Sequence, residues 1–197
     1  MATPVTQDLE ARAQAAWNNL TAQLAGLAPY LERADEPGEW TAREVLTHLL
    51  FPAGWDAVEL MKSFADRDLP VIEIEAGDPF MTPERRTMTL EQLVQALDAQ
   101  RRAVLTYLES LTEADLTRKA RIPLFKTFMG TEEIPLPAFV GALFEYHWND
   151  HASQFAKTTL NDTAARRRQR HRGAVDEKRN EEEPQKGQQQ NHPTPRS

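Results

Sequence analysis

Three histidines are the residues of this sequence best suited to chemistry. His147 and His151 lie four residues apart in one apolar run, and His48 lies in another. Four residues make just over one helical turn, so on a helix both imidazoles of the pair leave the same face. A bundle that packs the two apolar faces together can bring all three rings to one point. The remaining histidines, His171 and His192, lie in a polar C-terminal segment. The spacing therefore predicts a three-histidine metal site.

Neutral imidazole is a good ligand for borderline divalent metals such as zinc, nickel and iron. Three protein ligands leave coordination positions open, so such a metal can activate water or hold an anionic substrate atom. The predicted chemistry is therefore Lewis-acid activation. The alternative is that His147 and His151 are core histidines bonded to carbonyl groups and that His48 is unrelated to them.

Three polar residues are candidates for orienting these imidazoles. Glu44 lies one turn before the first histidine, Asp150 three residues after the second, and Gln154 three residues after the third. Each has a simpler alternative role: helix capping for Glu44, solvation for Asp150, and a bond to a helix neighbour for Gln154. Aromatic residues at helical spacing are candidates for an apolar wall, although core packing also explains them: Phe51, Trp55, Phe144, Trp148 and Phe155.

The helix that carries the first histidine has a sharply defined start. Thr41 and Glu44 have the spacing of a capping box, and the apolar pattern then continues to Phe64. Pro52 interrupts this pattern, and because proline has no N–H, the carbonyl of His48 loses its usual helical partner. The sequence predicts a helix that bends at this proline and frees that carbonyl, or alternatively a tolerated kink that only shapes packing.

Three further helices are predicted from the spacing of apolar residues. They cover about residues 7–24, 89–110 and 137–160, and the second of them begins with a capping box formed by Thr89 and Gln92. Four helices with long connections between the second and third and between the third and fourth predict an all-α fold, a four-helix bundle.

The long connections are predicted to be largely irregular. Residues 66–88 are too many for a plain turn, so this segment is a candidate lid over a site. Residues 112–115 are expected to form a short extra turn. Prolines and a glycine exclude a long helix over residues 118–136, and we expect extended chain over 122–128.

Composition limits the class of protein. The 197 residues suit one domain with an appendage, which we place at residues 1–160 and 161–197. The first part holds 14 Lys and Arg against 24 Asp and Glu, a net charge of −10 that argues against nucleic acid as its partner. The absence of cysteine excludes a disulfide framework and a cysteine nucleophile. No stretch has the length and composition of a signal or membrane helix, so we expect a cytoplasmic protein with no membrane partner.

The segment after residue 160 has a different composition. It is charged and glutamine-rich, with almost no large apolar residues, and we therefore predict a disordered tail. Its basic run from Arg166 to Arg172 leaves nucleic acid or an anionic membrane open as a partner of the tail. A solvated helix end is the simpler alternative, because no aromatic residues are interleaved for base stacking.

Two segments resemble the DinB-like superfamily, which includes the YfiT-type metal hydrolases and the thiol-dependent S-transferases. Residues 40–49 read Trp-Thr-Ala-Arg-Glu-Val-Leu-Thr-His-Leu, and residues 147–154 read His-Trp-Asn-Asp-His-Ala-Ser-Gln. The resemblance covers roughly residues 7–160. It implies a four-helix bundle that holds a divalent metal through His48, His147 and His151. Pro52 and Gly54, and the charged tail, depart from the family pattern.

The resemblance and the histidines together predict a metal-dependent transferase or hydrolase that activates an external thiol or water. The expected cofactors are a divalent metal and a low-molecular-weight thiol, and the expected partner is a small-molecule electrophile or thiol. The alternative is a non-enzymatic stress-response or interaction protein of the same fold. A homodimer is also compatible with the sequence.

Overall fold

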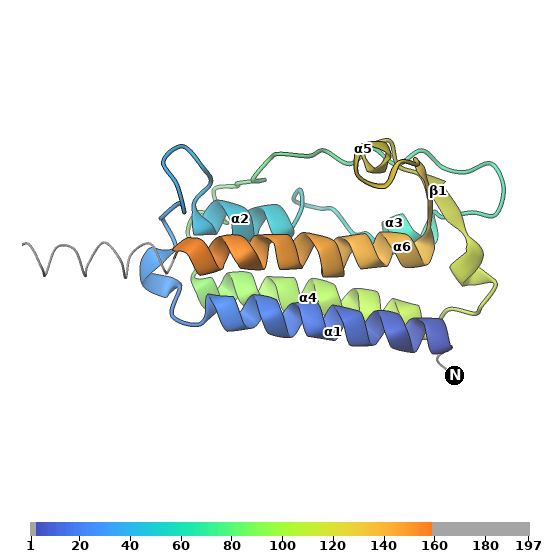
Figure 1. Cartoon of the computed structure of the whole chain (residues 1–197), viewed down its shortest axis with the longest axis horizontal. Coiled ribbons are helices and arrows are strands. Elements are labelled where there is room, and N and C mark those ends of the chain that lie inside the picture. Colours follow the sequence, from blue (N-terminus) through green and yellow to red (C-terminus); the bar gives the residue numbers. More distant parts are fainter. Residues whose placement is uncertain (1–2, 159–197) are drawn as a thin grey trace, which may run out of the picture. The chain divides into compact units, whose positions relative to one another are not determined.

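The computed structural model describes residues 3–158, and the predicted tail lies outside this part of the chain. The described residues are mainly helical (Figure 1): α1 (Pro4–Leu24), α2 (Ala42–Leu49), α3 (Ala57–Lys62), α4 (Leu90–Glu109), α5 (Phe125–Met129) and α6 (Leu136–Gly141). α1 packs on α4 and on the helix that begins with α6, while α2 and α3 both pack on α4. With α2 and α3 taken as one interrupted helix, the predicted all-α four-helix bundle is confirmed.

The predicted capping boxes are both present. The N–H of Thr41 donates to the Glu44 carboxylate at 2.7 Å, and the N–H of Glu44 donates to the Thr41 hydroxyl at 3.2 Å. Thr89 and Gln92 exchange the same two bonds at 2.8 and 3.2 Å. α1 begins before the predicted residue 7, because a threonine caps it and a proline occupies its first turn. Local capping chemistry therefore fixes where these helices start.

The prediction of one bent helix continuing to Phe64 is wrong, because the helix ends at Leu49. Phe51 adopts a left-handed backbone with φ of 60°, and its N–H bonds to the carbonyl of His48 at 3.0 Å. That carbonyl, predicted to be free, therefore has a partner. A left-handed residue commonly closes a helix, and Pro52, with no N–H, cannot continue it.

α3 is a separate helix with its own N-cap. The carboxylate of Asp56 accepts from the N–H groups of Val58 at 2.8 Å and Glu59 at 3.2 Å. Gly54, just before it, has φ of 85°, which glycine adopts without strain. A tight turn thus joins two short helices. The first of them, α2, ends one residue after His48.

A short β-hairpin occupies the third connection. β1 (Lys119–Arg121) pairs antiparallel with β2 (Glu133–Pro135), with Ala120 opposite Ile134. The extended chain expected over 122–128 is wrong, because α5 lies in the hairpin loop instead. Both central strand residues are fully buried, so packing on the bundle holds the hairpin in place.

The long connection over residues 66–88 is fastened to this hairpin. Ala65 and Lys119 exchange two backbone hydrogen bonds of 3.0 Å, and the N–H of Ile72 donates to the carbonyl of Arg121 at 2.8 Å. In Figure 1 the connection runs along the bundle from α3 past α5. The two connections therefore form one continuous layer over the helices.

The last helix changes its winding in the middle. α6 continues into a π-helical turn, Ala142–Tyr146, and then into α-helix over residues 147–158. A π turn contains one more residue than an α turn. Each residue advances an α-helix by about 100°, so everything after the turn is displaced by roughly that angle from an uninterrupted helix. His147 is the first residue after the turn.

Aromatic side chains of this last helix fill the core. Trp148, Phe144 and Phe155 are the largest fully buried side chains, and Trp148 packs on Trp17 of α1 with 5.6 Å between ring centroids. Within residues 3–158, no helix has both the length and the apolar composition needed to cross a bilayer.

Candidate metal centre

The structure brings the three predicted histidines together. One ligating nitrogen from each of His48, His147 and His151 lies within 4.8 Å of the other two. The Nε2 atoms of His48 and His147 are 2.9 Å apart. All three rings are half-buried, and they meet edge to face with centroid separations of 4.9 to 5.2 Å. Side chains 99 residues apart in sequence thus converge on one point.

The ring of His48 is held from the side away from its neighbours. Its Nδ1 lies 2.7 Å from the carbonyl oxygen of Asp78. A carbonyl can only accept, so Nδ1 carries the proton, and the lone pair of Nε2, the atom next to His147, is the one that can bind a metal. Phe80 stacks on the same ring at 5.8 Å with an interplanar angle of 6°, and Trp40 packs against it at 4.9 Å. The long connection thus fixes both tautomer and orientation.

Arg85 ties this connection to the end of α2. Its Nη1 donates to three carbonyl oxygens, those of Phe51 at 2.7 Å, Phe80 at 2.8 Å and Thr47 at 3.3 Å. These carbonyls belong to the residue before His48, the left-handed residue after it, and the residue that stacks on its ring. Sequence reasoning missed Arg85, because a lone arginine in a long loop carries no local signal of its partners.

The two histidines of the last helix are positioned by that helix itself. Gln154, one turn later, accepts through Oε1 from Nδ1 of His151 at 3.1 Å. This bond leaves the Nε2 of that ring free, which is the orienting contact considered for Gln154. His147 follows the π turn directly, and Phe51 packs against its ring in a tilted arrangement with 5.7 Å between centroids.

Burial keeps the three imidazoles neutral near pH 7. Burial, together with the charges of His151 and His48, lowers the pKa of His147 from 6.5 to about 3. Burial also lowers the pKa of His48 and that of His151, partly offset by their bonds to Asp78 and Gln154. Metal binding needs the neutral ring, so this environment prepares the donor set.

The donor set fits a divalent metal. A tetrahedral site with metal–nitrogen bonds of about 2.0–2.1 Å places its ligand atoms roughly 3.3 Å apart. The separations within the histidine cluster, from 2.9 Å to at most 4.8 Å, bracket this value. In His48 and His151 the Nδ1 proton is donated to a neighbouring oxygen, so Nε2 is the nitrogen left to bind a metal.

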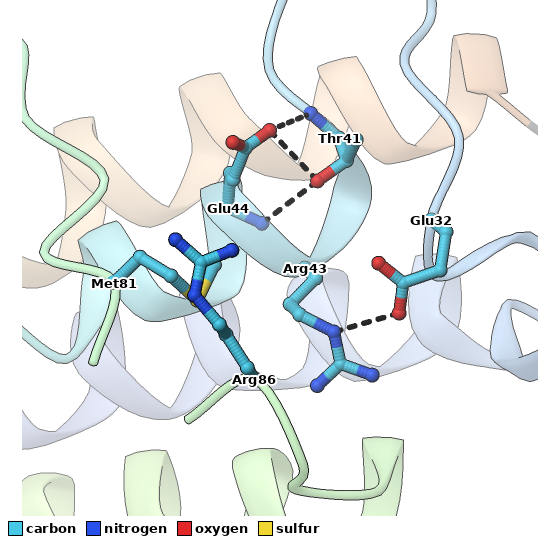
Figure 2. A pocket seen from close by; sticks show the side chains of 6 residues that line it. All are labelled: Glu32, Thr41, Arg43, Glu44, Met81 and Arg86. Carbon is cyan, nitrogen blue, oxygen red and sulfur yellow. Dashed lines mark hydrogen bonds and ion pairs between the residues drawn. The ribbon is translucent and has the colours of Figure 1, made fainter. Parts of the chain in front are cut away.

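Glu44 is occupied as a helix cap. Figure 2 shows its carboxylate turned back toward Thr41, whose N–H donates at 2.7 Å and whose hydroxyl donates at 2.8 Å. Nearby, Arg43 pairs with Glu32 at 2.7 Å beside a small hollow of about 280 Å³. Of the two roles considered for Glu44, the structure shows capping.

The other candidate wall residues divide into two groups. Trp55 lines a cavity beside the histidines and stacks on Phe51 at 4.0 Å, and the exposed Asp150 lies on the same lining. Phe144 instead packs on Trp148 in the core, with 4.8 Å between centroids. The π turn explains the difference, because it turns Leu143 and Tyr146 toward the cavity.

The cavity has a volume of about 690 Å³ and contains all three histidines in its wall. The rest of its lining comes from the turn between α2 and α3, the long connection, α5 with the residue before it, and the last helix including α6 and the π turn. Such a volume is in the range of small-molecule sites, about 300–1000 Å³. The arrangement can therefore hold a metal at one side of a pocket large enough for a substrate.

None of the curated protein sequences compared with this chain matches it. Among solved structures, the chain resembles YfiT from Bacillus subtilis, described as a probable metal-dependent hydrolase with an unusual four-helix bundle topology. The TM-score is 0.56 with 17% sequence identity, over 82% of this chain and 87% of that one. This similarity supports the fold of the bundle.

The sequence profile of the DinB superfamily matches residues 6–155, a range that contains all three histidines of the site and the described helices except for the first two residues of α1 and the last three of the final helix. The match therefore covers most of the chain, and its limits are close to those of the described bundle. The chain belongs to the DinB superfamily.

Proposed function

We propose that this protein is a metal-dependent transferase or hydrolase, with His48, His147 and His151 as the ligands of a divalent metal such as zinc, nickel or iron. The observation that carries the proposal is the convergence of three neutral imidazoles on one point at the wall of a cavity. Three ligands leave a position open toward that cavity, as in catalytic rather than structural sites.

The residues around the triad have separable roles in this proposal. Asp78 and Gln154 fix the ring orientations through the Nδ1 atoms, and the aromatic rings of Phe51 and Trp55 limit the access of water from one side. A bound metal supplies Lewis-acid activation of an external thiol or of water. In this proposal Asp150, which lines the cavity, accepts the proton that the nucleophile releases.

Metal content tests the first part of the proposal. Protein purified without a histidine tag should contain about one divalent metal ion per chain, and His147→Ala should lose most of it, because two imidazoles hold a metal far more weakly than three. His171→Ala is the matched control, since it removes an imidazole outside the triad. Equal metal content in the His147 variant and the control would contradict the proposal.

Reaction type is tested by two assays on the metal-loaded protein. The first follows the conjugation of a small thiol to 1-chloro-2,4-dinitrobenzene, and the second follows hydrolysis of p-nitrophenyl acetate without thiol. Turnover in the first assay alone identifies a thiol transferase, and turnover in the second identifies a hydrolase. In either case His147→Ala should abolish the activity.

A further inference from the structure

The cavity beside the triad offers little to a charged ligand. The described residues that line it include no lysine or arginine, and its two charged side chains, Glu75 and Asp150, are acidic. An anionic ligand would therefore meet repulsion from these carboxylates and no side chain of opposite sign, so that only the proposed metal could attract it. Both carboxylates are exposed, so solvent screens their attraction for a cation. The lining thus favours an uncharged molecule.

Exposed apolar side chains gather at this cavity. Within residues 3–158 five large apolar residues are exposed, and three of them line the cavity: Phe128 at 73%, Met129 at 45% and Tyr146 at 70%. Single exposed apolar residues are common, but several around one concave site indicate a place where apolar surface is covered on binding. Two of the three belong to α5, and the third belongs to the π turn.

α5 itself is held mainly by residues that face the same cavity. It has five residues and none of them is buried. A helix of this length has little stability of its own. The half-buried Leu124 and Phe125, at its start, pack against the core and also line the cavity. A ligand that fills the cavity would therefore add apolar contacts to a segment that has few.

From these observations we infer that the cavity takes an uncharged, largely apolar small molecule, the electrophile of the proposed reaction, and that Phe128 and Met129 contact it at the entrance. The inference rests on the proposed function for its chemistry. The volume of about 690 Å³ suits a small molecule, and the concave, aromatic wall next to the histidines suits a planar apolar group.

A pair of fluorescent probes that differ by one charged group tests this inference. N-phenyl-1-naphthylamine is neutral and apolar, whereas 8-anilinonaphthalene-1-sulfonate has the same aromatic framework with a sulfonate. The full-length protein, freed of metal by a chelator, should bind one neutral probe per chain about tenfold more tightly than the anion, because the anion then finds no cation in the cavity. Phe128→Ser should weaken binding of the neutral probe by about tenfold, through loss of apolar contact.

Val71→Ser is the matched control, because Val71 is 61% exposed and does not belong to the cavity lining. Its binding of the neutral probe should equal that of the unchanged protein. Circular dichroism confirms that both variants fold. Equal affinity in the Phe128 and Val71 variants, or equal affinity for the two probes, would overturn the inference. It would also be overturned if the exposed side chains served a membrane, shown by sedimentation with phosphatidylcholine vesicles that depends on Phe128.

The metal content of the same proteins, measured before the chelator is added, separates this inference from the proposed function. A protein that contains metal but shows no dependence on Phe128 contradicts the substrate class and leaves the metal site standing. A protein without metal whose probe binding depends on Phe128 supports the apolar ligand and contradicts the proposed metal chemistry.

Discussion

The two sides of the histidine cluster are built in different ways. On one side, His147 and His151 belong to a single helix, and the orienting partner, Gln154, lies on the same helix one turn later. On the other side, His48 lies at the end of a short helix. The carbonyl that orients its ring belongs to Asp78, a loop residue 30 positions further along the chain. The helix side, with His147 and His151, is therefore positioned by contacts close in sequence. The loop side, with His48, is positioned by contacts between distant parts of the chain.

This difference predicts where the site is vulnerable. The spacing of His147 and His151 is kept as long as the last helix is formed. Substitutions on the helix side should therefore alter metal affinity more than the free energy of unfolding. The loop side is held through Arg85, whose three hydrogen bonds join the end of α2 to the connection. Changes on that side should reduce the free energy of unfolding and metal affinity together.

The largest effect is expected from Arg85→Ala. Three carbonyl oxygens lose a charged donor, and the free energy of unfolding of the metal-free protein should fall by about 3 kcal/mol. Urea unfolding followed by circular dichroism measures this change. Arg86→Ala is the control, because the neighbouring side chain is exposed and its removal should change the free energy by less than about 0.5 kcal/mol. Equal midpoints for the two variants would show that the loop side does not depend on Arg85.

A smaller effect concerns pH and the helix side. The pKa of His147 is lowered to about 3 in the folded protein, so the unfolded chain takes up a proton first as the pH falls through 6.5. The free energy of unfolding of the metal-free protein should therefore fall on acidification, by about 2 kcal/mol for this ring between pH 7 and pH 5. This loss continues until the pH approaches the folded value near 3.

Urea unfolding at several pH values, compared with His147→Leu, isolates the contribution of this ring. The carboxylates titrate in both proteins, so the difference between the two curves reports on His147. A difference that stays constant from pH 7 to pH 5 would show that the ring is not buried in its neutral form.

The smallest effect is expected from Gln154→Ala. The variant removes the oxygen that accepts from Nδ1 of His151, so metal affinity should fall by about tenfold, with the free energy of unfolding changed by less than about 1 kcal/mol. Competition with a chromogenic chelator measures the affinity. Lys157→Ala, an exposed change on the same helix, should leave it unchanged. A large loss of folding stability in the Gln154 variant would break the contrast between the two sides.

The same contrast explains what could be predicted from the sequence. The capping boxes at Thr41 and Thr89 depend on residues three apart, and both predictions are confirmed. The spacing of His147 and His151 is also local, and the structure places both rings at one point with His48. Their use as metal ligands stays a prediction.

The parts that the sequence did not reveal depend on contacts distant along the chain. The role of Asp78 as a backbone partner and that of Arg85 arise only when the connection folds back on α2. The hairpin was missed because its strands have only three residues each. The break after Leu49 had a usable signal, since Asp56 and Glu59 have the spacing of a helix start.

The bond from His48 to Asp78 has a thermodynamic consequence. Asp78 directly follows Gly77, which with Ile74, Glu75 and Ala76 belongs to the cavity wall. The ring and that stretch of wall are therefore connected through one short piece of backbone. A metal that binds the His48 ring in its present position also stabilises the present conformation of this stretch of wall. A ligand that binds to the wall in this conformation stabilises the same position of the ring. Such a coupling is reciprocal, so each of the two should tighten the binding of the other by the same factor.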